Sequence, residues 1–146
     1  MTTLASTIIK NGRVIDGTGN PWFKASIAIK DGKISKISAI PIPGGDTTID
    51  ATGFVVAPGF IDSHTHSDNS VMTNPRCENH IRQGVTTNVT GSCGSGEYHV
   101  EELRNAIEKK GTAVNFAHMV GMNKIREHLY GSERTRWELI LSLIHI

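Results

Sequence analysis

The fold is decided by the stretch from Val55 to Asp68, which reads VVAPGFIDSHTHSD. An apolar run passes through Pro-Gly, and the polar side chains come only at its far end. A buried strand that brings functional groups to the rim of a sheet or barrel has this pattern. Alternate side chains of a strand share a face, so Asp62, His64 and His66 are expected to point the same way.

Two imidazoles aimed at one point form half of a metal site. Neutral imidazole is the commonest protein ligand for zinc and related metals. The alternative is that His64 and His66 are ordinary strand residues, since a bare His-x-His pair also occurs by chance. The surrounding frame favours the metal site, because the pair follows a Gly-Phe-Val-Val-Ala strand and a Pro-Gly-Phe-Ile-Asp segment.

Length and composition are those of a soluble globular protein. The 146 residues carry a formal net charge of +1, with Lys and Arg spread along the chain, so neither nucleic acid nor a membrane surface is favoured as a partner. The first residues lack the pattern of a signal peptide, and no stretch is long enough to span a bilayer, so a cytoplasmic protein is expected.

Two cysteines, Cys77 and Cys93, do not make a disulfide framework, and in a reducing compartment each is better interpreted as buried, catalytic or metal-binding.

Residues 1–57 are expected to form a small all-β domain. The dipeptides Asn11-Gly12 and Asp31-Gly32 each predict a tight type I′ turn between two strands. A further turn is expected at residues 51–53, which read Ala-Thr-Gly.

From residue 58 to about residue 140, strands alternate with helices. The sequence predicts helices at 79–83, 100–110 and 123–130, another from 136 onward, and strands at 85–90 and 113–117. Gly84 and Gly111 are placed to end the first two helices, and the charges at the two ends of the 100–110 helix suit its dipole. Such alternation argues for parallel strands joined by crossover helices.

Cys93 is a third candidate ligand. It lies in the Gly-rich loop 91–96, directly after the second of these strands. If that strand is a parallel neighbour of the strand before His64, both residues lie at the rim where parallel α/β barrels have their active sites. A thiolate at that rim can ligate or bridge zinc. The alternative is a small buried cysteine in a tight loop.

These motifs resemble the amidohydrolase superfamily, in which Pro-Gly-x-Ile-Asp-x-His-x-His stands at the start of the barrel. Residues 82–87, Arg-Gln-Gly-Val-Thr-Thr, followed by Gly-Ser-Cys-Gly, look like the Gln-Gly-Val-Thr-Thr and Gly-Asn-Cys-Gly signature of the N-acyl-D-amino-acid deacylases, or D-aminoacylases. Residues 120–126 are similar to the Val-Gly-His-Asn-Thr-Val-Arg segment of that family. The likeness runs from about Ile8 to about Leu139.

The resemblance implies a site for one or two zinc ions with His64, His66 and Cys93 as ligands, and a small N-acyl amino acid as substrate. Asp62 and Asp68 are expected to support the ligands without binding the metal. The chain departs from the family at Ser92, where Asn is usual, and at Met122, where His is usual.

Other polar residues are weaker candidates. Asn69 and His118 are possible pocket-lining residues, although His118 is equally well explained as a satisfied residue at a strand end. The remaining singled-out residues are interpreted as structural: Cys77, His80, His99 and His128.

The chain is shorter than the fold that the resemblance implies. A (β/α)8 barrel takes about 250 residues, so an α/β fold is expected that holds part of a small β-sandwich (1–57) and the first strands and helices of an incomplete TIM-like barrel (58–140). The resemblance also implies a catalytic Asp and further His ligands, which are expected downstream of this fragment, so no catalytic residue is assigned here. The last six residues, 141–146, look like a translated sequencing adapter, with an apolar helix end as the alternative.

The intact protein is therefore expected to be a zinc-dependent hydrolase of linear amides that deacylates N-acyl-D-amino acids. A cyclic-amide hydrolase of the dihydroorotase or hydantoinase type shares the His-x-His frame, but those enzymes typically bridge their metals with a carboxylated Lys, so the Gly-x-Cys-Gly loop argues against it. The alternative from another class is a truncated, non-catalytic chain whose open strand edge and uncovered apolar face favour aggregation. For the 146-residue chain alone we predict no activity and poor solubility.

Overall fold

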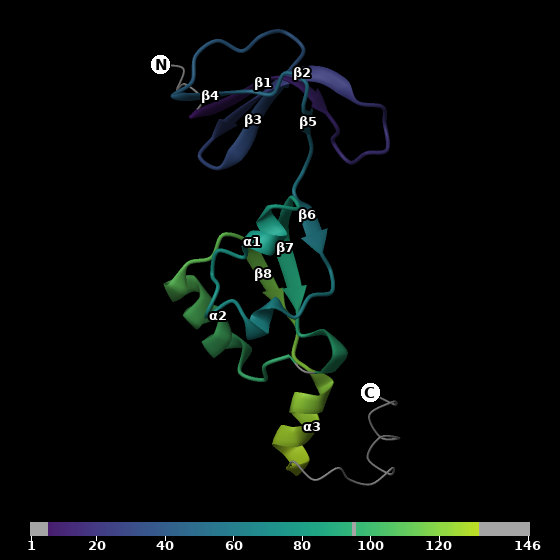
Figure 1. Cartoon of the computed structure of the whole chain (residues 1–146), viewed down its shortest axis with the longest axis vertical. Helices are drawn as coiled ribbons and strands as arrows, with labels where there is room; N and C mark the ends of the chain where they lie inside the picture. Colours follow the sequence, from purple (N-terminus) through teal and green to yellow (C-terminus); the bar gives the residue numbers. More distant parts are fainter. Residues whose placement is uncertain (1–5, 95, 132–146) are drawn as a thin grey trace. The chain divides into compact units, whose positions relative to one another are not determined.

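The computed structural model describes residues 6–94 and 96–131 (Figure 1). It divides into two compact units, the first ending at Pro58 and the second beginning at Gly59. The helix predicted from residue 136 and the tail at 141–146 lie outside the described residues. Within the described ranges, no helix has the length and apolar character needed to cross a membrane.

The first unit is a mixed five-stranded sheet. Its strands are β1 (Thr7–Val14), β2 (Phe23–Lys30), β3 (Lys33–Ser38), β4 (Thr47–Asp50) and β5 (Val55–Val56). The order is β3-β2-β1-β4, and β5 also pairs with β1. The pairs β1–β2 and β2–β3 are antiparallel, whereas β4 and β5 each run parallel to β1. The core of this unit centres on Val14, Ala25 and Ile27.

The hairpin predicted at Asn11-Gly12 is wrong. Strand β1 continues through both residues, and its pairing with β2 shifts register between Ile9 and Gly12. A type I′ turn needs positive φ at both central residues, but only Asn11 has it, at 64°. The chain therefore forms a bulge rather than a turn. Pairing of β1 with β4 and β5 on its other edge keeps the two halves in one strand.

The second predicted hairpin is confirmed. Asp31 and Gly32 have φ of 51° and 71° and connect β2 to β3, with Lys30 opposite Lys33. The turn at 51–53 is also present, since the Phe54 N–H donates to the Ala51 carbonyl at 2.9 Å.

The carboxylate of Asp50 anchors that turn to β1. Its Oδ1 accepts hydrogen bonds from the Thr52 hydroxyl (2.7 Å), the Asn11 amide (3.0 Å) and the Thr52 N–H (3.0 Å). These bonds lower the pKa of Asp50 from 3.8 to about 2. Because the folded-state pKa is depressed, the stabilising contribution is complete above the ordinary pKa of 3.8 and is lost as pH falls through about 2.

We expect Thr52→Ala to raise the pKa of Asp50 towards 3.8, and by more than Asn11→Ala does, because the Thr52 hydroxyl makes the shorter hydrogen bond. The measurement is a carboxyl-carbon NMR titration. Asp16 is an internal control, since Thr18 lowers its pKa through a similar pair of hydrogen bonds and neither substitution touches it. An unchanged pKa of Asp50 in both variants would contradict the assignment.

The second unit is a parallel three-stranded sheet with helices, as the alternating pattern predicts. Its strands are β6 (Phe60–Asp62), β7 (Val85–Thr90) and β8 (Asn115–His118), in the order β6-β7-β8. The helices are α1 (Glu78–Ile81), α2 (Val100–Lys110) and α3 (Met122–Tyr130), with short 3-10 turns η1 (Ser67–Asn69) and η2 (Ser92–Gly94). Helix α2 has the predicted bounds and ends at Gly111, whose φ is 74°.

The core of the second unit lies between the turn after β6, helix α2 and the segment leading into β8. Its buried members are Val71, Cys77, Ile107 and Val114. Leu103 of α2 and Phe116 of β8 pack against this cluster. The core therefore fixes the parallel sheet on which the candidate site is built.

Candidate metal centre

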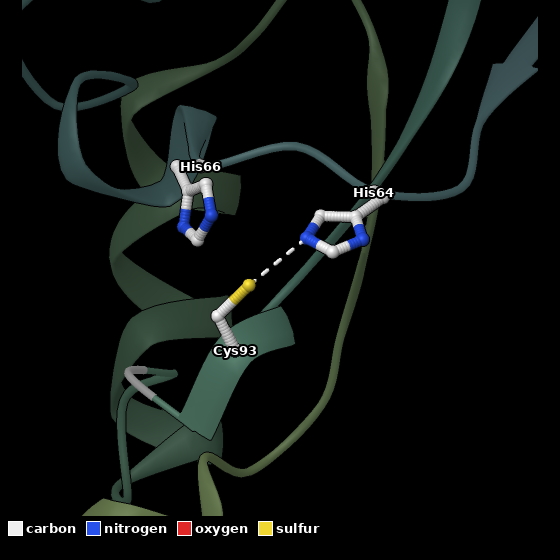
Figure 2. A group of neighbouring side chains, drawn as sticks. All are labelled: His64, His66 and Cys93. Atoms are coloured by element: carbon white, nitrogen blue, oxygen red, sulfur yellow. Dashed lines mark hydrogen bonds between the residues drawn. The ribbon is translucent and has the colours of Figure 1, made fainter.

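The three predicted ligands meet at the carboxyl edge of the parallel sheet. His64 follows β6 and Cys93 follows β7, and the two strands are paired in parallel with Asp62 opposite Asn88. His64 Nε2 lies 3.1 Å from Cys93 Sγ. One ligand atom from each of His64, His66 and Cys93 lies within 4.8 Å of the others, and Figure 2 shows both imidazoles facing the sulfur.

The two histidines converge by a different route from strand alternation. Strand β6 ends at Asp62, before either histidine. The chain stays beside β7 because the Thr65 N–H donates to the Val89 carbonyl at 3.1 Å. His66 then precedes η1 with φ −108° and ψ 27°, which is not an extended conformation. The His64 and His66 rings meet edge to face, with centroids 5.8 Å apart. The prediction of one continuous strand through His66 is therefore wrong.

Cys93 is presented by a strained loop. Its φ of 59° lies in the left-handed region, which few residues other than glycine adopt. Flanking glycines allow the loop to pack backbone to backbone against the segment after β8. A Cβ added at Gly91 would overlap the backbone of Met119, and one at Gly121 would overlap the backbone of Gly94 and Gly96. The Gly121 N–H also donates to the Gly96 carbonyl at 3.1 Å. This packing fixes where the thiol lies.

The donor set fits a zinc ion. In a tetrahedral site with Zn–N of about 2.0–2.1 Å and Zn–S of about 2.3 Å, neighbouring ligand atoms are roughly 3.5 Å apart. The observed separations, 3.1 Å for one pair and at most 4.8 Å for any pair, are close to that value. All three residues are exposed, so an ion can reach them. Two imidazoles and a thiolate favour zinc over the hard cations that select oxygen ligands.

Asp62 contacts the backbone of His64, one of the three candidate ligands. Its Oδ1 accepts the N–H of His64 at 3.1 Å. Its other oxygen lies 3.9 Å from Nε2 of His80 on α1, and the same Nε2 lies 3.4 Å from the Thr65 hydroxyl. His80 therefore touches residues on both sides of His64. Sequence reasoning missed this link, because nothing in the spacing pairs His80 with Asp62.

Asp68 lies in η1, directly after the segment that holds His64 and His66, and its side chain is only 8% exposed. One of its oxygens lies 3.9 Å from Nδ1 of His118, at the end of β8. His118, which the sequence left ambiguous, is thereby joined to the turn that follows His66.

The remaining candidates lie apart from the three candidate ligands. Cys77 is buried in the core, and burial raises the pKa of its thiol. His99 and His128 both contact the ring of Tyr98, and His128 stacks on it at 4.2 Å. Met122, where the family usually has His, begins α3 and is 62% exposed.

Comparison with known proteins decides the family. Residues 47–139 match the sequence profile of the amidohydrolase family. The chain belongs to the amidohydrolase family. It is 34% identical to the D-aminoacylase of Alcaligenes xylosoxydans xylosoxydans, over 82% of this chain and 29% of that protein.

Solved structures agree with this assignment. A D-aminoacylase whose binuclear metal centre has been studied superposes with a TM-score of 0.80 and 30% identity, covering 94% of this chain and 34% of that one. The N-acyl-D-glutamate deacylase of Bordetella bronchiseptica, solved with zinc and a phosphonate mimic of the tetrahedral intermediate, gives 0.80 and 28%, covering 91% of this chain and 32% of that one. The chain spans about a third of the length of these relatives.

Proposed function

We propose that this chain supplies the zinc-binding part of an enzyme that removes the acyl group from N-acyl-D-amino acids. The observation that carries the proposal is the convergence of His64, His66 and Cys93 at the carboxyl edge of a parallel sheet. Support comes from the D-aminoacylase and the zinc-containing deacylase to which the chain is similar.

The fold is proposed to be the opening of a larger one. The mixed sheet of the first unit is compatible with part of a β-sandwich, and the parallel order β6-β7-β8 is compatible with the first strands of a (β/α)8 barrel. Active sites of such barrels lie at the carboxyl ends of the strands, which is where the three ligands lie.

Each residue has a defined task in this proposal. His64, His66 and Cys93 would hold a zinc ion, which when bound supplies a Lewis acid that activates water and the amide carbonyl. Asp62 holds the backbone of His64 through its N–H, so the imidazole is presented at a fixed point on the rim. A general acid or base that passes a proton to the leaving amine is proposed to come from a downstream segment.

The first test concerns the gene. Sequencing past the codon for Leu139 is expected to show an open frame that supplies further His residues and a late Asp. Expression of that frame should give hydrolysis of N-acyl-D-amino acids, with little turnover of the L-enantiomers or of hydantoins. Preferential turnover of hydantoins would replace the proposal with a cyclic-amide hydrolase. A stop codon directly after Ile146 would mean that the chain descends from a deacylase but has kept only its metal-binding motif and has no activity.

The 146-residue chain alone is expected to show no deacylase activity and to aggregate. The described part offers three ligand atoms, and the group that passes a proton to the leaving amine is proposed to lie downstream. Phe60 and Ile61 of β6 are 63% and 66% exposed, and exposed apolar side chains on a sheet edge promote association. Soluble expression with measurable release of acid from an N-acyl-D-amino acid would contradict this expectation.

A further inference from the structure

We propose that His118 is a positioning residue for the metal centre, acting through Asp68 on the turn that follows His66. The inference rests on the metal site proposed above. His118 belongs to β8, a strand that supplies none of the three ligands. Its side chain is 7% exposed and that of Asp68 is 8% exposed, so the two form a buried polar pair at the rim of the sheet.

The pair is tied to the sheet by Thr90. In the parallel pairing of β7 with β8, Thr90 stands opposite His118. The Thr90 hydroxyl lies 2.7 Å from His118 Nδ1, and Thr90 is completely buried. The same Nδ1 lies 3.9 Å from an Asp68 carboxylate oxygen. His118 therefore contacts Thr90 of β7 on one side and Asp68 of η1 on the other.

The turn η1 is anchored to the neighbouring strand as well. The Asn88 side-chain amide of β7 donates to the Ser67 hydroxyl at 2.9 Å, and both residues are buried. The Asn69 N–H donates back to the His66 carbonyl at 3.2 Å, which closes the turn onto the ligand residue. A change in how Asp68 is held would therefore move the backbone that sets the direction of the His66 imidazole.

A role in packing alone does not account for this pair. Asp68 Oδ1 and His118 Nε2 are buried, and neither has a hydrogen-bond partner among the described residues. Buried polar atoms are nearly always paired, and the exceptions tend to serve a site or a bound group. Residues that orient metal ligands typically change metal affinity by about 10–100-fold when they are replaced.

The test uses the metal-free product of the longer open frame described above, titrated with Co²⁺, a spectroscopic probe for a zinc site, and follows the thiolate-to-cobalt absorption from Cys93. His118→Ala is expected to weaken Co²⁺ binding by about 10-fold or more and to alter the d–d spectrum at saturation. His118→Asn should restore both the affinity and the spectrum, since its side-chain amide reaches the position of Nδ1. His118→Gln places its amide at the position of Nε2 and should restore neither.

Thr90→Val, which removes the hydroxyl without loss of volume, should resemble His118→Ala. His99→Ala, an exposed histidine outside this network, is the matched control.

The outcomes separate the inference from the proposed function. Equal affinity and identical spectra for the parent chain and His118→Ala would overturn the role of His118 while leaving the metal site intact. Equal weakening in all three His118 variants, with a matching fall in unfolding temperature, would show a purely structural residue and would also overturn it. A parent chain that gives no thiolate-to-cobalt band would overturn the proposed metal site, and the inference with it.

Discussion

Replacing Cys93 by serine is expected to lower the affinity for Zn²⁺ by at least about 100-fold, the upper end of what loss of a residue that orients a ligand costs. The reason is that an undissociated hydroxyl replaces one of the three ligand atoms that the described residues offer. The sulfur lies 3.1 Å from His64 Nε2, so the substitution removes a donor at the centre of the cluster. Serine has nearly the volume of cysteine, and Cys93 is exposed, so the fold should be preserved. Competition between the protein and a chromophoric chelator measures the affinity directly.

Cys77→Ala is the matched control for this prediction. Cys77 is the other free cysteine among the described residues, and it is buried in the core of the same unit. Its removal should lower the stability slightly and leave the zinc affinity unchanged, because burial keeps that thiol protonated. Equal zinc affinity in the parent and Cys93→Ser would show that the metal does not use the thiolate, and the proposed ligand set would be wrong.

The features that could be predicted from sequence are those set by neighbours along the chain. Helix α2 has acidic residues in its first turn, lysines in its last and a glycine after its end, so its bounds follow from local chemistry. The turn at Asp31-Gly32 is likewise specified by two adjacent residues. The grouping of His64 and Cys93 follows from one additional assumption, that the strands before them are parallel neighbours.

The features that could not be predicted depend on distant partners. Asn11-Gly12 has the local signal of a turn, but strands β4 and β5, about forty residues later in the chain, pair with β1 and keep it continuous. The contact between Asp68 and His118 joins the turn η1 to the end of β8, about fifty residues later in the chain. The neighbouring contact of His118 with Thr90 depends on the register of β7 against β8, which sets the two residues opposite each other, and register is not encoded by spacing.

Gly91→Ala is expected to destabilise the second unit by about 2–5 kcal/mol and to abolish the metal site. Two effects add at this position. Gly91 has φ of 86°, where a residue with a Cβ is disfavoured by about 1–2 kcal/mol. The new Cβ would also overlap the Met119 backbone, and moving backbone apart in a packed region adds about 1–3 kcal/mol. Urea unfolding and the cobalt absorption from Cys93 measure the two consequences.

Gly111→Ala separates these effects, because Gly111 has a similar φ of 74° and no atom within 4 Å of the added Cβ. It should therefore show the conformational penalty alone and retain the cobalt spectrum. If both variants lose the same stability and both keep the spectrum, the backbone contact at Gly91 does not position Cys93. If only Gly91→Ala loses the spectrum, the loop after β7 is held by the segment after β8, and the metal centre depends on a third strand that contributes no ligand to it.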